Sequence, residues 1–118
     1  MALLRLTRAR GRGVRRTLRF TAEADRQLAE LERRVDKKGL LGQVRKTLGF
    51  LEVNLRHPSL STHEFQSLQG IGGERVWEAY IQNRTPGAYR IFFHYGPDEG
   101  VGKKRVATLT ILAITPHP

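Results

Sequence analysis

The chain has 118 residues, a length that suits one domain with room for a substantial hydrophobic core. Its hydrophobic share of 39% is low for a globular protein but too high for a disordered one. The absence of cysteine excludes disulfides, thiolate metal sites and thiol catalysis. No apolar run approaches the ~18 residues that a membrane span needs, so we expect a cytoplasmic protein with no membrane partner.

Positive charge is the strongest compositional feature. The formal net charge is +10 at pH 7, which favours an anionic partner such as nucleic acid. Residues 1 to 19 hold seven arginines and no acidic residue, whereas the rest of the chain carries 14 basic and 11 acidic residues. We therefore predict that residues 1–16 form an arginine-rich extension that need not be ordered. It fits a basic arm for phosphates, an organellar transit peptide or a plain flexible extension.

The folded domain is predicted to begin at residue 17. Residues 17–20 (TLRF) alternate polar and apolar side chains, which indicates a first strand. Thr21 then fits a helix N-cap, and apolar residues at 24, 28, 31 and 35 form one stripe of an amphipathic helix that ends near Gly39. A second stripe at 40, 44, 48, 51 and 55 predicts another helix, which must stop before Pro58. The two helices should form a hairpin with one shared apolar seam.

A long connection is predicted over residues 56–75. The glycines at 70, 72 and 73 should turn the chain there, but no strand feeds them and no lysine follows, so they do not predict a phosphate cradle. His57 and His63 lie in this connection without a third residue at metal-ligand spacing, and we expect no metal site.

Three antiparallel strands are predicted to complete the domain, at 76–81, 88–95 and 105–114. Within the middle strand, side chains alternate between faces, so Arg90, Phe92 and His94 should share one face. The other face and its neighbouring strand should supply core residues, namely Ile91, Phe93, Leu109 and Ile111. With helices covering one face, the opposite face should stay partly open as a shallow groove. The fold class is α+β.

An arginine in the middle of a strand has two interpretations. Arg90 either extends past Phe92 to solvent as an ordinary surface residue, or it serves a functional site on the open face.

Several segments together carry a family resemblance. Residues 54–60 read NLRHPSL, residues 76–81 VWEAYI, residues 87–93 GAYRIFF, and residues 115–118 TPHP. With the order strand, two helices, three strands, residues 17–118 resemble the RelE/ParE toxin superfamily of type II toxin–antitoxin modules. The resemblance implies a RelE-like fold and a metal-independent endoribonuclease without cofactors, an mRNA interferase that inhibits translation. Its partners would be mRNA on the ribosome and a cognate antitoxin.

The same resemblance implies roles for particular residues. Arg90 matches the strand arginine that stabilises the phosphate, and His117 matches a C-terminal histidine of some RelE-like members. Glu78 lies near the position where some members supply a carboxylate base. These three are the expected catalytic residues. Substrate-binding residues would be Tyr80, His94 and Arg84.

The chain also departs from the nuclease pattern. Ala79 and Tyr80 stand where RelE-like nucleases carry paired basic residues, and Pro118 stands where a tyrosine is expected. Two alternatives therefore stay open: a ParE-like inhibitor of DNA gyrase, and a catalytically eroded RelE-fold domain that binds RNA or protein.

Overall fold

The structure is a computed structural model that describes residues 2–7, 15–82 and 87–116. In these residues the elements follow the order β1 (Ala2–Thr7), β2 (Thr17–Thr21), α1 (Ala22–Arg33), α2 (Lys38–Val53), β3 (His63–Gln69), β4 (Arg75–Tyr80), β5 (Tyr89–Tyr95) and β6 (Thr108–Pro116). Short 3₁₀ turns lie at Val35–Lys37, Pro58–Leu60 and Gly102–Lys104. No helix within these ranges is long and apolar enough to cross a membrane.

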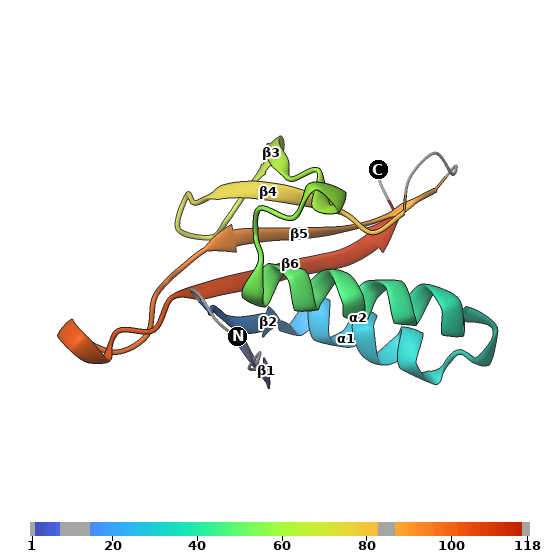
Figure 1. Cartoon of the computed structure of the whole chain (residues 1–118), viewed down its shortest axis with the longest axis horizontal. Coiled ribbons are helices and arrows are strands. Elements are labelled where there is room, and N and C mark those ends of the chain that lie inside the picture. Colours follow the sequence, from blue (N-terminus) through green and yellow to red (C-terminus); the bar gives the residue numbers. More distant parts are fainter. Residues whose placement is uncertain (1, 8–14, 83–86, 117–118) are drawn as a thin grey trace.

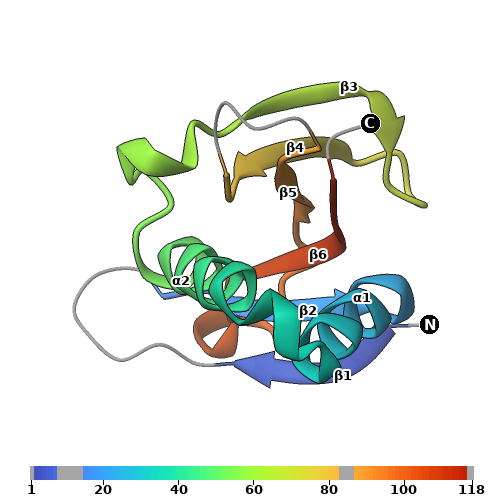
Figure 2. The same cartoon turned by 90° about the vertical axis from the view of Figure 1, so that its right-hand side faces the viewer.

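One mixed sheet carries all six described strands, in the order β1-β2-β6-β5-β4-β3. β2 and β6 are parallel, and every other neighbouring pair is antiparallel. Both helices lie side by side on one face of the sheet (Figures 1 and 2). This arrangement confirms the α+β class, the two helices and the antiparallel pairing of the last two strands.

The core lies between the helices and the sheet. Leu28 from α1 and Val44 and Leu51 from α2 pack there against the strands. The four residues predicted for the core, Ile91, Phe93, Leu109 and Ile111, are all fully buried in it, as expected.

The sheet has two strands that the sequence did not predict. β3 lies inside the segment 56–75, which was wrongly predicted to be a connection without strands, and it pairs with β4 across the predicted glycine turn. Gly73 has a φ of +82° in that turn, a conformation that glycine adopts at little cost. β1 lies inside the arginine-rich extension and pairs with β2. The first helix also ends earlier than predicted, at Arg33, and a 3₁₀ turn leads into α2.

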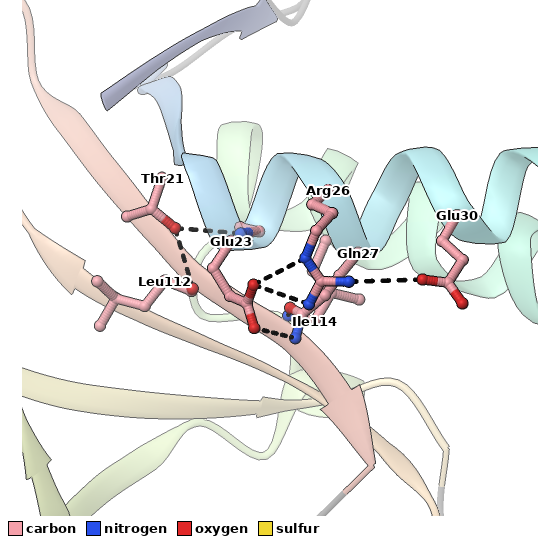
Figure 3. A network of polar contacts seen from close by, with 8 residues as sticks. Thr21, Glu23, Arg26, Gln27, Glu30, Leu112 and Ile114 are labelled. Carbon is pink, nitrogen blue, oxygen red and sulfur yellow. Dashed lines mark hydrogen bonds and ion pairs between the residues drawn. The ribbon is translucent and has the colours of Figure 1, made fainter. Parts of the chain in front are cut away.

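Helix α1 is anchored to the sheet by two polar side chains at a bulge in β6. Phe92 pairs with Ala113 and Phe93 with Ile111, which leaves Leu112 as the extra residue. β2 ends at Thr21, and its last backbone pairing with β6 joins Phe20 to Ile111. Beyond that pair, the Thr21 hydroxyl donates to the Leu112 carbonyl at 3.0 Å, and Gln27 Oε1 accepts the Ile114 amide at 2.7 Å (Figure 3).

The same threonine hydroxyl also caps the helix, because it accepts the Ala24 amide at 3.1 Å (Figure 3). On the solvent side of α1, Arg26 bonds Glu23 at 2.8 Å and faces Glu30 at 3.5 Å. These exposed pairs add little to stability, so the position of α1 depends mainly on its buried stripe and on the Thr21 and Gln27 contacts.

Candidate functional site

Four polar side chains gather on the sheet face that points away from the helices. His63 of β3 lies opposite Glu78 of β4, and Tyr80 of β4 lies opposite Arg90 of β5. We call these four residues the polar cluster. Because strands alternate their faces, the neighbours Trp77, Ala79 and Ile91 point to the helix side instead. Strand pairing alone therefore brings the cluster together.

Glu78 is the centre of the polar cluster and is 1% exposed. Its Oε1 lies 2.6 Å from Nε2 of His63, and its Oε2 lies 3.9 Å from Nε of Arg90. The second distance makes an ion pair but exceeds a hydrogen bond. A buried carboxylate needs such partners, since its desolvation is costly without them.

His63 is the exposed member, with 46% of its side chain accessible. Its Nδ1 lies 2.9 Å from the carbonyl oxygen of Ser61, and its Nε2 faces the Glu78 carboxylate. Both ring nitrogens thus face oxygen atoms, and a neutral imidazole donates its single N–H to one of them. The arrangement holds an imidazole ring at the surface with a carboxylate behind it.

Arg90 is held tightly and is only 8% exposed. Its Nη1 donates to the carbonyls of Gln82 at 2.6 Å and Tyr89 at 3.0 Å. Its guanidinium carbon lies 3.8 Å from the centre of the Tyr80 ring, a cation–π contact. The surface interpretation of Arg90 is therefore wrong: it is a buried cation with Glu78 as its counter-ion. It lies on the face opposite the helices, not beneath them.

The open face is less open than the sequence predicted. Phe92 was expected to border a shallow groove, yet it is 2% exposed because Phe65 of β3 packs edge-on against it at 5.0 Å between ring centres. The unpredicted strand β3 thus covers this part of the face.

His94 shares the face of Arg90 but not its site. Four residues along one strand separate them by about 13 Å. His94 is buried, and its Nδ1 donates to the Tyr95 carbonyl at 3.0 Å. It lines a separate cavity of about 400 Å³ together with Arg19 and Glu74. The pKa of Glu74 lies below its usual value because its carboxylate accepts its own backbone amide and that of Gly72.

The predicted site residues thus divide into three groups. Glu78, Tyr80 and Arg90 come together, whereas His94 lies apart. Arg84 and His117 fall outside the described residues, so the roles expected for them stay predictions.

His63 is the cluster residue that sequence reasoning missed. The pattern of residues 63–69 (HEFQSLQ) has no clear alternation, so it predicted a connection and not a strand. The usable signal was the glycine turn at 70–73. A hairpin folded there brings residue 63 opposite residue 78.

Within the described ranges, no group of three or more His, Asp or Glu side chains is placed to hold a metal ion. The chemistry available at the polar cluster is proton transfer by His63 and charge stabilisation by Arg90. No family model, curated protein or solved structure matches this chain. The chain is an α+β domain with a histidine–carboxylate–arginine cluster on the sheet face away from its helices.

Proposed function

We propose that this protein is the toxin of a type II toxin–antitoxin system, a RelE-like endoribonuclease that cuts mRNA on the ribosome and so inhibits translation. The observation that carries the proposal is the polar cluster, in which His63, Glu78 and Arg90 meet on adjacent strands away from the helices. The RelE/ParE-like segments described above also support it, because two members of the polar cluster, Glu78 and Arg90, belong to them.

The proposed reaction is attack of a ribose 2′-hydroxyl on the adjacent phosphorus. The 2′-oxygen–phosphorus bond forms, the bond to the 5′-oxygen breaks, one group takes the hydroxyl proton and another protonates the leaving oxygen. His63 is half-exposed, so it suits one of these two proton transfers, which its Nδ1 can make once a substrate oxygen replaces the Ser61 carbonyl beside it. His117 is the residue that the resemblance offers for the other transfer.

Glu78 takes a different role from the one first expected. At 1% exposure it cannot reach a ribose hydroxyl, so it does not act as the base. It is a positioning residue that orients the His63 ring and balances its charge, as a carboxylate does behind many catalytic histidines. The Arg90 guanidinium places a positive charge next to Glu78, where it would stabilise the negative charge of the phosphorane transition state.

A cognate antitoxin is the expected protein partner in the cytoplasm. The β3–β4 hairpin offers it apolar contacts, because Leu68 and Ile71 are exposed there. An amphipathic antitoxin segment lying along this hairpin would cover His63 at the same time.

The burial of Arg90 favours a second candidate. A guanidinium held by Gln82, Tyr89 and Tyr80 already has its partners, and a phosphate would have to compete with them. A catalytically eroded RelE-fold domain that binds RNA or protein, or a ParE-like gyrase inhibitor, needs no free arginine at this position.

Induced expression in a bacterium tests the proposal. Translation should fall before DNA supercoiling changes, and primer extension should map new mRNA ends. His63→Gln should slow cleavage by about 10²–10⁴-fold, the usual contribution of a proton-transfer group. Gln66→Ala, on the exposed part of the same strand, is the control and should cleave normally.

Two other outcomes would replace the proposal. Gyrase cleavage complexes with an SOS response before any loss of translation would favour the ParE-like function. Normal growth with soluble, folded protein would favour the eroded domain.

A further inference from the structure

A second cavity lies at the C-terminal end of α2, outside the polar cluster. It has a volume of about 680 Å³ and is bounded by residues 53–62 on one side and by the helix-side face of β4 and β5 on the other. That volume falls within the range of about 300–1,000 Å³ that small-molecule sites occupy.

Two aromatic rings form the sheet side of this cavity. Trp77 and Tyr95 lie 6.1 Å apart at an interplanar angle of 85°, and Tyr95 is 46% exposed. Phe93 also contacts Tyr95, at 6.0 Å between ring centres, so two neighbouring rings hold the Tyr95 ring in place while nearly half of the residue stays exposed. A fixed, exposed aromatic ring is what an unpaired nucleobase stacks on.

The opposite side of the cavity is cationic. Arg16 and Arg56 line it, and no Asp or Glu is among the described residues that do. His57 also lines it, with its ring stacked on Phe50 at 3.9 Å. Because Nδ1 of His57 accepts the Ser59 amide at 3.1 Å, the ring proton sits on Nε2 as a further donor. The cavity therefore combines stacking surfaces with donors for phosphate oxygens.

We propose that this cavity is a binding site for single-stranded RNA, with one base stacked on Tyr95 next to Trp77 and its phosphates on Arg16 and Arg56. The choice of RNA rests on the proposed function. An acidic peptide would also suit the arginines, but the flat exposed ring and the net charge of +10 favour a nucleic acid.

The cavity and the polar cluster lie next to each other along the chain. Ser61 and Thr62 line the cavity, and His63 follows them directly. Trp77 and Glu78 are neighbours in β4 that face opposite sides of the sheet. A strand of RNA anchored in the cavity would therefore have to pass the edge of the sheet near the start of β3 to reach His63.

Fluorescence anisotropy with a labelled oligoadenylate RNA hexamer tests the site. Tyr95→Leu should weaken binding by about 5- to 100-fold through lost stacking, without changing the salt dependence. Arg56→Gln should reduce the slope of log K against log salt by about 0.7, the value for one lost phosphate contact on a single strand. Arg33→Gln, at the C-terminal end of α1, is the matched control: it also removes one arginine charge and should leave the affinity and the salt slope nearly unchanged. Trp77, the sole tryptophan, should be quenched on binding.

The outcomes separate this inference from the proposed function. Binding that the cavity variants weaken, with no cleavage by the wild type, would support the site and count against the nuclease. Cleavage by the wild type with unchanged RNA binding in the cavity variants would overturn the site alone. A wild type that does not bind the hexamer, or that binds a Glu-rich peptide more tightly than the RNA, would also overturn it.

Discussion

At the scale of single residues, the central feature of the site is the buried ion pair between Arg90 and Glu78. Two opposite charges 3.9 Å apart in a buried region attract each other strongly, but each also loses its hydration. Arg90 recovers part of that loss through its two carbonyl acceptors, and Glu78 through His63. Replacing one member of the pair should therefore lower the free energy of unfolding more than replacing both members together.

A double-mutant cycle should reveal this asymmetry. Arg90→Met removes the guanidinium that lies beside the buried Glu78 carboxylate, and we expect a loss of about 3–5 kcal/mol in the free energy of unfolding. Glu78→Gln should cost a similar amount. The double variant should be much less destabilised than the sum of the two, because no uncompensated charge remains.

Urea denaturation of the four proteins measures the cycle. Additive losses would mean that the two charges do not depend on each other. A loss below about 0.5 kcal/mol for Arg90→Met would instead assign Arg90 to the surface class of arginines. Since Arg90 variants are expected to lose stability, a loss of cleavage in them is informative only at a temperature where they stay folded.

At the scale of elements, the sequence predicted what regular patterns encode. Apolar stripes at helical spacing located α1 and α2, alternation located β2, and runs of β-branched and aromatic residues between turns located β4, β5 and β6. β3 was missed because little of this edge strand is buried: residues 66–69 are all exposed, and its main packing contact is Phe65 against Phe92. That missing strand explains the missed site residue, since His63 comes to Glu78 only through the β3–β4 pairing. Burial of Arg90 was missed for another reason: its contacts with the Gln82 carbonyl and the Tyr80 ring depend on the fold around the strand ends and leave no pattern in the sequence.

The link between α1 and the β6 bulge gives an element-scale prediction. Thr21→Val keeps the shape and β-branching of the side chain but removes the hydroxyl that caps α1 and satisfies the Leu112 carbonyl. An N-cap loss alone costs about 0.5–2 kcal/mol, and an unsatisfied, partly buried carbonyl adds to it. We expect a total loss of about 1–3 kcal/mol in the free energy of unfolding.

Thr21→Ser is the matched control for this prediction, because it keeps the hydroxyl and should stay within about 0.5 kcal/mol of the wild type. Thermal or urea unfolding provides the measurement. Equal stability of the valine and serine variants would show that the hydroxyl anchors neither the helix nor the bulge.

At the scale of the whole molecule, the arginine-rich start and the folded domain overlap more than their compositions indicate. Residues 1–16 were expected to stand outside the domain, yet Ala2–Thr7 forms the outermost strand beside β2. Among the residues whose side chains the structure describes, the core nevertheless runs from Leu18 to Ile114, within the predicted domain. The start of the chain therefore has two separable effects: it carries charge, and it covers the edge of β2.

Removal of residues 1–14 should separate these effects. The shortened chain should keep its helices and the rest of its sheet in circular dichroism, because it retains every core residue that the structure describes. Its β2 edge would expose unpaired amides and carbonyls, which invite pairing with a second chain. We expect a lower melting temperature and concentration-dependent association in light scattering.

A full-length control with glutamine at positions 5, 8, 10 and 12 loses the same four arginines but keeps a chain that can form β1, and it should stay monomeric. If both proteins associate equally, the positive charge of the first 14 residues, and not the coverage of the β2 edge, prevents wild-type chains from associating. If the shortened chain unfolds, β1 is an integral part of the domain.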